Sequence, residues 1–394
     1  MNCFSINLPA SKSISNRALI LNALSYCPYS INNLSDCNDT KVLFDALVSN
    51  ENKFDIEGTG TAMRFLTAYF SKIVGEWYIT GDARMKQRPI GVLVDAINRL
   101  GGRIEYTENE GYPPLKIFGS ALVGGEIEIE GDTSSQFISS LLMIAPTMEK
   151  GLTLNIKGKI ISKPYINMTL ALMKKFGVAF SWKGNVINVP PDSYIPIPIM
   201  VESDWSAASY WFEIMALSND NNIFYLKGLE KNSIQGDSIV VELFKQFGVM
   251  SKFSHHGLKL EKNGTNIKKF RYDFSDNPDL TQTFAVTCAF LNIPFIFTGL
   301  QTLKIKESDR ISALTNELRK FGYDVKNNNS DSLWWDGTKI EKQKNIQVET
   351  YNDHRMALAF APALLKTDPF EIINPNIVMK SYPSFWDDFK KVYR

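Results

Sequence analysis

The chain has 394 residues, 44% of them hydrophobic, which is enough for two domains with separate cores. It carries 43 Lys and Arg against 42 Asp and Glu, so no overall field favours nucleic acid or an anionic membrane, and any cationic site must be local. Its four cysteines (Cys3, Cys27, Cys37 and Cys288) lack metal-like spacing and fit a reducing compartment, which predicts a cytoplasmic protein.

Neither a secretory signal nor a membrane span is predicted. The first residues lack a basic region followed by an apolar stretch. The most apolar segment, residues 284–300, is too short to span a bilayer and is interrupted by Asn292 and Pro294. We interpret it as a buried helix followed by a strand.

Six polar or charged clusters each open an apolar run long enough for a helix. From the second onward they begin 74, 72, 73 and 74 residues apart, and the first gap is 45. A helix start has unpaired N–H groups and partial positive charge, so it suits phosphate or carboxylate. Capping alone explains many such starts, but capping does not need the Arg, Lys, His and Gln found here. The clusters begin at Ser15, Gly60, Ser134, Ser206, Asp279 and Asp353.

A second recurrence has the same period. Four amphipathic segments end at Gly101, Gly177, Gly248 and Gly322, which are 76, 71 and 74 residues apart and suit left-handed helix caps. Each is followed by a predicted strand, at residues 103–106, 178–182, 249–253 and 323–326. Two features with one period indicate a duplicated unit of two helices and about four strands. Six units, some abbreviated, fill the chain, with a crossover between its halves near residues 190–198.

Several clusters combine side chains that suit anionic substrates. Lys12 supplies a point charge and Arg17 a planar fork, a pairing suited to phosphate beside carboxylate. Residues 84–88 hold three basic side chains, which could bind an anion or could simply form a solvated basic turn. Residues 306–310 and 353–355 contain both acidic and basic side chains, which a site that only binds anions would not need. An ordinary ion-pair network on the surface is the alternative interpretation of these two segments.

The ordered set of motifs resembles the EPSP synthase family of enolpyruvyl transferases over nearly the whole chain. The resemblance implies an α/β fold of α+β type, a two-domain inside-out barrel in which each domain has three βαβαββ units and the active site lies in the interdomain cleft. The expected domains are residues 11–200, and residues 1–10 plus 201–394. The matching motifs are LPASKSISNR (8–17), GTAMR (60–64), RMKQRPI (84–90), SSQF (134–137), SKPYI (162–166), QGD (235–237), KESDR (306–310) and YNDHRMA (351–357).

The resemblance implies enolpyruvyl transfer from phosphoenolpyruvate to shikimate 3-phosphate, without cofactor, metal, nucleic acid or membrane, by a monomer. It implies Asp279 as the base at the ring hydroxyl and Glu307 as a second proton-transfer group, with Lys12 also catalytic and His354 as a nearby aid. The implied shikimate 3-phosphate contacts are Lys12, Ser13, Arg17, Ser134, Ser135, Gln136, Ser162, Tyr165, Asp279 and Lys306. The implied phosphoenolpyruvate contacts are Lys12, Gly60, Arg84, Gln136, Arg310, Arg355 and Lys380.

The chain departs from the family pattern at three places. Gly58 and Thr302 stand where the family often has Asn, and the chain begins about ten residues late, so we expect it to lack a first strand. Gly60 lies where glyphosate packs closely in sensitive members, which predicts sensitivity to this inhibitor.

Three alternatives remain open. A sister enzyme acts on UDP-N-acetylglucosamine with a cysteine in the loop before Arg-Pro, and residues 82–89 contain none. RNA-terminal phosphate cyclases would need a basic face, whereas the net charge is +1. A non-catalytic anion-binding relative would not need Asp279 and Glu307, because carboxylates weaken anion binding.

Overall fold

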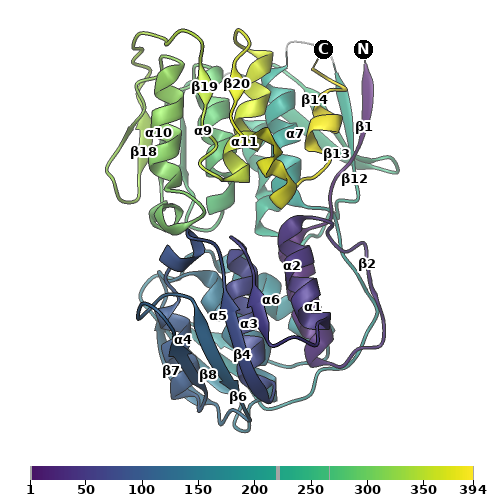
Figure 1. Ribbon diagram of the computed structural model, residues 1–394. Helices are drawn as coiled ribbons and strands as arrows, with labels where there is room; N and C mark the ends of the chain where they lie inside the picture. Colours follow the sequence, from purple (N-terminus) through teal and green to yellow (C-terminus); the bar gives the residue numbers. More distant parts are fainter. Residues whose placement is uncertain (1, 219–221, 266, 394) are drawn as a thin grey trace. The chain divides into compact units, whose positions relative to one another are not determined.

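The computed structural model describes residues 2–218, 222–265 and 267–393, and it divides into two compact units (Figure 1). Unit 1 comprises Met1–Ser11 with Glu202–Arg394, and unit 2 comprises Lys12–Val201. The divisions expected from the sequence lie one residue earlier at each junction.

Unit 2 contains three sheets, with the strand orders β3-β4-β6-β5, β7-β8-β10-β9 and β11-β2. Its strands are β2 (Ile31–Asn32), β3 (Lys53–Asp55), β4 (Gly75–Thr80), β5 (Arg103–Tyr106), β6 (Leu115–Gly119), β7 (Gly125–Glu130), β8 (Leu152–Lys157), β9 (Ser181–Lys183), β10 (Val186–Val189) and β11 (Ile199–Met200). Its helices are α1 (Lys12–Leu24), α2 (Asn38–Val48), α3 (Gly60–Lys72), η1 (Met85–Gln87), α4 (Gly91–Arg99), α5 (Ser135–Ile144), η2 (Ala145–Thr147) and α6 (Lys163–Lys175).

The described residues of unit 1 likewise form three sheets, with the orders β1-β12-β14-β13, β15-β16-β18-β17 and β19-β20. Its strands are β1 (Cys3–Asn7), β12 (Ile223–Lys227), β13 (Val249–Ser254), β14 (Gly257–Lys262), β15 (Phe270–Asp273), β16 (Phe295–Thr298), β17 (Lys326–Asn327), β18 (Leu333–Trp335), β19 (Gln347–Val348) and β20 (Glu371–Ile372). Its helices are α7 (Trp205–Leu217), η3 (Gly236–Ile239), α8 (Val240–Lys245), η4 (Pro278–Leu280), α9 (Thr281–Phe290), η5 (Gln301–Ile305), α10 (Arg310–Lys320), α11 (His354–Phe360), η6 (Ala361–Leu365), η7 (Pro375–Lys380) and α12 (Phe385–Phe389).

The repeat predicted from the sequence is visible in the sheets. All four four-stranded sheets have one topology, in which the first two strands are parallel and the other two pair antiparallel. The two-stranded sheets β11-β2 and β19-β20 keep only a parallel pair. The repeat is therefore present in six copies, two of them abbreviated.

One sheet in each unit is completed by a strand that is distant in the sequence. Strand β1 pairs in parallel with β12, from Cys3 opposite Ile223 to Asn7 opposite Lys227, and β11 pairs in parallel with β2. This strand was not predicted from the sequence, and the expectation that the chain lacks a first strand of the family stays a prediction. Residues 3–7 alternate in burial and form this strand because they hydrogen-bond to the edge of β12. This edge is some 220 positions away in the sequence, so the local sequence does not reveal it.

The predicted glycine caps are confirmed. Gly101, Gly177, Gly248 and Gly322 have φ of +96°, +88°, +79° and +87°, values that residues with a Cβ adopt only under strain. Two of the strands expected after them are shorter than predicted, beginning at Ser181 and at Lys326. The first residues after those glycines still donate hydrogen bonds back into the preceding helix, to the carbonyls of Met173 and Leu318, and so belong to the cap.

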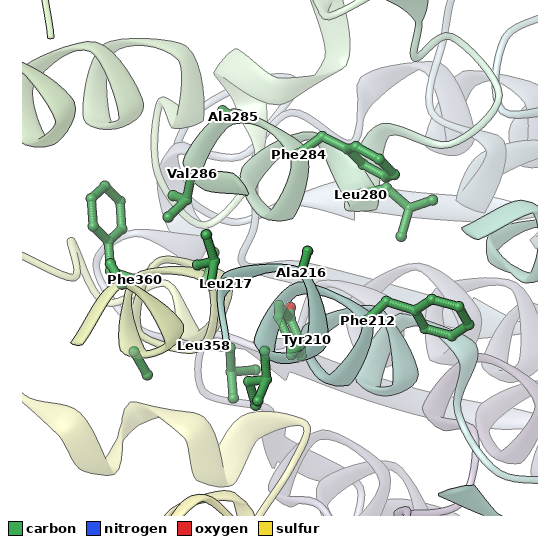
Figure 2. Packing of buried hydrophobic residues seen from close by; sticks show 14 of the residues in the cluster. Tyr210, Phe212, Ala216, Leu217, Leu280, Phe284, Ala285, Val286, Leu358 and Phe360 are labelled. Atoms are coloured by element: carbon green, nitrogen blue, oxygen red, sulfur yellow. The ribbon is translucent and has the colours of Figure 1, made fainter. Parts of the chain in front are cut away.

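The helices that open with polar clusters are the inner helices of each unit. In unit 1 every residue of α9 and α11 is buried, and so are twelve of the thirteen in α7. Figure 2 shows how Phe212 of α7, Phe284 of α9 and Leu358 of α11 belong to one apolar cluster. A helix that is buried on all sides lies inside its domain, and its first turn is the part whose N–H groups have no acceptor within the helix.

Residues 284–300 form most of α9 and then β16, the buried helix and strand predicted for this segment. Within the described residues, no helix is both long and apolar enough to cross a membrane.

Candidate active site

Four helix starts supply the predicted polar residues of unit 2. Lys12 is the first residue of α1 and Gly60 the first residue of α3, while Ser134 and Ser162 are the N-cap residues of α5 and α6. Helices α1, α3 and α5 pack against one another, and α6 packs against α1 and α5. The repeat thus places the positive ends of these helices, with N–H groups that have no acceptor within the helix, in one helical cluster.

Lys12 is held by a carboxylate that the motifs did not reveal. Its Nζ lies 3.0 Å from Oδ2 of Asp39, at the start of α2, and both side chains are largely buried. The hydroxyl of Thr59 lies 3.4 Å from the other oxygen of Asp39. One carboxylate therefore links the first turns of α1 and α3 and orients the lysine ammonium.

Arg17 is a buried connection between helices. It donates from Nε to Oγ1 of Thr169 (2.7 Å), from Nη1 to the carbonyl of Ser13 (2.9 Å) and from Nη2 to Oγ of Ser139 (3.2 Å). Burial lowers the pKa of Arg17 to about 10, so it remains charged at neutral pH. The guanidinium joins α1, α5 and α6 and thereby fixes the spacing of their starts.

The hydroxyl and amide residues lie at the starts of α5 and α6. Ser134 caps α5 by accepting the N–H of Gln136, and Nε2 of Gln136 reaches Oγ1 of Thr61 in the first turn of α3 at 3.1 Å. Ser135 is the first residue of α5. Ser162 has a left-handed backbone (φ +54°), a strained conformation that is often found at binding sites.

Tyr165 contributes its backbone to this network. Its carbonyl accepts from Nη2 of Arg17 at 3.4 Å and from the hydroxyl of Thr169 at 3.0 Å. The start of α6 is thus tied to the guanidinium that also contacts α5.

The three basic side chains of residues 84–88 lie in different environments. Arg84 is exposed at the start of η1. Lys86 pairs with Glu108 at 2.6 Å in a solvent-exposed ion pair of the kind that adds little stability. Arg88 is only 5% exposed, and its guanidinium lies over Gly60. The solvated alternative thus describes Lys86 but not Arg88.

The charged residues of unit 1 gather around one carboxylate. Asp279, in η4, accepts from Nη1 of Arg310 at 3.0 Å and from Nη2 of Arg355 at 2.7 Å. Arg310 also pairs with Glu307 at 3.0 Å, one turn earlier. The structure therefore brings Asp279 and Glu307 together with Arg310 and Arg355, two of the predicted phosphoenolpyruvate contacts. These residues form one cluster and are not separate ion pairs on the surface.

Asp353 is the anchor of this cluster. Its carboxylate accepts from Nε of Arg310 at 2.7 Å, from the hydroxyl of Ser308 at 3.1 Å and from the backbone N–H of Arg355 at 3.0 Å. Burial alone would lower the pKa of Arg310, but the charges of Asp353, Glu307 and Asp279 outweigh burial and raise it. His354, the first residue of α11, is 1% exposed beside this anchor.

Two further titratable groups adjoin Asp279. Burial, followed by the charge of Asp279, raises the pKa of Asp237 to about 6, and Asp237 accepts from the hydroxyl of Ser206 at the start of α7. Burial raises the pKa of Tyr210 to about 12, and its hydroxyl lies 3.4 Å from Nη1 of Arg355. The cluster thus extends to the first two turns of α7.

The two remaining predicted lysines are placed by short helices. Lys306 follows η5, next to Glu307, and is half-buried. Lys380 ends η7, which packs on α11. Among residues 2–218, 222–265 and 267–393, no group of three His, Cys, Asp or Glu side chains is arranged to hold a metal ion.

Three carboxylates were not assigned a role from the sequence. Asp353 and Asp237 lie within motifs, and a carboxylate at a helix start beside Arg is the signal that could have identified Asp353. Asp39 had no such signal, because its pairing with Lys12 depends on how α2 packs against α1.

Comparison with known proteins identifies the family of this chain. Residues 46–389 match the family model described as EPSP synthase (3-phosphoshikimate 1-carboxyvinyltransferase). A 3-phosphoshikimate 1-carboxyvinyltransferase of Bacteroides fragilis is 53% identical over 98% of this chain and 94% of its own length. A 3-phosphoshikimate 1-carboxyvinyltransferase of Haemophilus influenzae is 35% identical over 98% of this chain and 96% of its own length.

Solved structures show the same fold. The EPSP synthase of Acinetobacter baumannii has a TM-score of 0.77 at 20% identity, covering 99% of this chain and 95% of its own. The enolpyruvyl transferase NikO of Streptomyces tendae has a TM-score of 0.76 at 14% identity, covering 99% and 94%. With the family model and the two full-length relatives, these comparisons establish that the chain belongs to the EPSP synthase (3-phosphoshikimate 1-carboxyvinyltransferase) family.

Proposed function

We propose that this protein transfers the enolpyruvyl group of phosphoenolpyruvate to the 5-hydroxyl of shikimate 3-phosphate and releases inorganic phosphate. This is a step of the shikimate pathway toward chorismate and the aromatic amino acids. The observation that carries the proposal is the position of Asp279, a carboxylate held between Arg310 and Arg355 in a member of this family. We further propose that it acts as a cytoplasmic monomer.

The reaction needs a base, an acid and cationic groups. In the addition step the ring hydroxyl loses its proton, its oxygen bonds to the enol carbon of phosphoenolpyruvate, and the methylene carbon gains a proton. In the elimination step that carbon loses a proton again and the bond to the phosphate oxygen breaks. Proton transfer by positioned groups contributes about 10²–10⁴-fold, and holding the two reactants together contributes more.

We assign Asp279 as the base at the ring hydroxyl and Glu307 as the second proton-transfer group. Arg310 contacts both carboxylates, so one guanidinium fixes the distance between them. An incoming carboxylate or phosphate competes with Asp279 for Arg310 and Arg355. In this proposal, substrate binding therefore releases the oxygen atoms of Asp279 for proton transfer. His354, buried beside Asp353, is a positioning aid.

The proposal also assigns the residues that bind the two substrates, several of which lie at helix starts. In unit 2, Lys12, Ser13, Arg17, Ser134, Ser135, Gln136, Ser162 and Tyr165 serve shikimate 3-phosphate, together with Asp279 and Lys306 of unit 1. Lys12, Gly60, Arg84 and Gln136 serve phosphoenolpyruvate, together with Arg310, Arg355 and Lys380. The two reactants carry four anionic groups in total, and helix starts with Lys and Arg are suited to hold them without metal.

The test is phosphate release from shikimate 3-phosphate and phosphoenolpyruvate, comparing the natural protein with Asp279→Ala. We expect the variant to lose about 10²-fold or more in rate while it retains most substrate binding. The control is Asp276→Ala, an exposed aspartate three residues away, which should stay within about twofold of the natural rate. An unchanged rate for Asp279→Ala would remove this residue from the mechanism.

The same assay decides between acceptors. Phosphate release with UDP-N-acetylglucosamine but not with shikimate 3-phosphate would favour the sister activity, which the absence of cysteine from residues 82–89 argues against. Binding of both reactants without phosphate release would indicate a non-catalytic relative.

A further inference from the structure

Helix α10 contacts the segment that leads into α11 at two points. At the start of the helix, Arg310 donates to the carboxylate of Asp353 from Nε at 2.7 Å and from Nη2 at 3.3 Å. Two turns later, on the same face of the helix, Glu317 accepts from the hydroxyl of Tyr351 at 2.7 Å and from the backbone N–H of Glu349 at 3.1 Å. The first contact belongs to the ion cluster of the candidate site, whereas the second has no role in the mechanism proposed above.

The carboxylate of Glu317 is fully buried, and both of its oxygens are occupied. Oε1 accepts from Tyr351, while Oε2 accepts from Glu349 and from Nζ of Lys320 at 2.7 Å. Lys320 also donates to the carbonyl of Gln347, in β19, at 2.8 Å. A buried carboxylate needs a counter-charge and hydrogen-bond donors, and the chain that leads into α11 supplies two of these donors.

Tyr351 occupies a turn whose backbone is unfavourable for it. The N–H of Asp353 donates to the carbonyl of Thr350 at 2.8 Å and closes the turn. The two central residues, Tyr351 and Asn352, have φ of +53° and +55°. Turns with two central residues at positive φ favour Gly, Asn or Asp, because other side chains are strained there. Asparagine tolerates this conformation, but a tyrosine needs a compensating contact.

The hydroxyl of Tyr351 makes that contact. The residue is 39% exposed, so packing of its ring provides only part of the compensation. A hydroxyl that donates to a carboxylate forms one of the stronger hydrogen bonds in proteins. Burial, followed by the hydrogen bond to Glu317, raises the pKa of Tyr351 to about 12, so the phenol keeps its donated proton at neutral pH.

The turn sets the direction in which the chain enters α11. Asp353 follows Asn352 directly, is fully buried and is the N-cap residue of α11. Its carboxylate accepts from the N–H of Arg355 at 3.0 Å as well as from Arg310. A change in the backbone of the turn therefore displaces both the carboxylate that anchors Arg310 and the helix start that carries Arg355.

We propose that Glu317 is a positioning residue of the site, which holds the turn of residues 350–353 in its left-handed conformation through the hydroxyl of Tyr351. The turn in this conformation places Asp353 and Arg355. This inference rests on the proposed function and adds a residue that acts through others. It also gives a role to Tyr351, which opens the motif of residues 351–357.

The test is Tyr351→Phe, which removes the hydroxyl and keeps the ring. In the phosphate-release assay, kcat should fall about tenfold, because small displacements of catalytic groups are costly. KM for phosphoenolpyruvate, the proposed ligand of Arg355, should rise about three- to tenfold, and KM for shikimate 3-phosphate should change less than about twofold. Tyr26→Phe is the matched control, since Tyr26 also has a positive φ (+49°) but is 86% exposed, and it should behave as the natural protein.

Hydrogen exchange provides a measurement that does not depend on catalysis. Without ligand, the N–H groups of Glu349 and Asp353 are hydrogen-bonded and should exchange slowly in the natural protein. In Tyr351→Phe, exchange in residues 349–353 should be about tenfold faster, while residues 257–262 of β14 should be unchanged. If the natural protein released no phosphate, the proposed function would fail, and this comparison would still test the link between Glu317 and the turn.

A double variant tests whether the two residues act through one contact. Glu317→Gln removes the charge and one of the two acceptor oxygens, and it should also lower kcat. The loss in Glu317→Gln with Tyr351→Phe should be clearly smaller than the product of the two single losses, because both changes weaken the same interaction.

Three outcomes would overturn the inference. Tyr351 and Glu317 are merely structural if Tyr351→Phe lowers the unfolding temperature but leaves kcat and both KM values as in the natural protein. They act independently if the losses in the double variant multiply. The turn does not depend on the hydroxyl if Tyr351→Phe leaves exchange in residues 349–353 unchanged.

Discussion

The ion pairs around Arg310 predict a large and pH-dependent loss of stability on Arg310→Met. The side chain is 2% exposed and contacts Asp279, Glu307 and Asp353 at 3.0, 3.0 and 2.7 Å. Removing one partner from a buried ionic cluster costs about 3–5 kcal/mol, because the other charges stay buried without compensation. For a unit of this size, about 2–4 °C per kcal/mol gives a fall of roughly 6–20 °C in unfolding temperature.

The sign of the pH dependence follows from the carboxylates left behind. Without the guanidinium they repel one another and bind protons more tightly in the folded state than in the unfolded state. A group of this kind stabilises the fold at low pH, and that contribution is lost as pH rises through the folded-state pKa. The deficit of Arg310→Met relative to the natural protein should therefore be larger at pH 7.5 than at pH 5.

Thermal unfolding at both pH values, without substrates, measures this effect. The matched control is Arg319→Met on the same helix, whose arginine is 47% exposed and lies 3.0 Å from Asp324. An exposed pair of this kind contributes at most about 1 kcal/mol. Equal losses for the two variants, or a loss for Arg310→Met that does not change with pH, would refute the reasoning.

Two other predictions concern the core and the inhibitor. Glu213 is fully buried in α7 and burial raises its pKa well above the ordinary value, so stability should fall as pH rises from about 4 toward the folded-state pKa. Glu213→Gln should remove that slope in denaturant titrations between pH 4.5 and 8, and a slope parallel to the natural protein would contradict the assignment. Because Gly60 lies at the uncapped start of α3, glyphosate should compete with phosphoenolpyruvate and raise its apparent KM. Unchanged phosphoenolpyruvate binding at high glyphosate concentration would rule this out.

Local signals in the sequence determined the repeat and the helix starts. A glycine that ends a helix in a left-handed conformation has a short-range cause, and Gly101, Gly177, Gly248 and Gly322 were therefore predictable. The same holds for the polar clusters that open the inner helices, since capping and the helix dipole act within one turn. The family motifs likewise located Asp279, Glu307, Arg310 and Arg355 before their contacts were known.

Only the tertiary structure decided which charges meet. The partners of Lys12 and Arg310 include Asp39 and Asp353, which are 27 and 43 positions away, and an ion pair depends on distance in space. Strand β1 was missed for the same reason, because a short strand is defined by the distant edge with which it pairs. The sequence by itself therefore determined the units and their polar helix starts, whereas helix packing decided that Asp279 is bound by two arginines and that Arg88 is buried against Gly60.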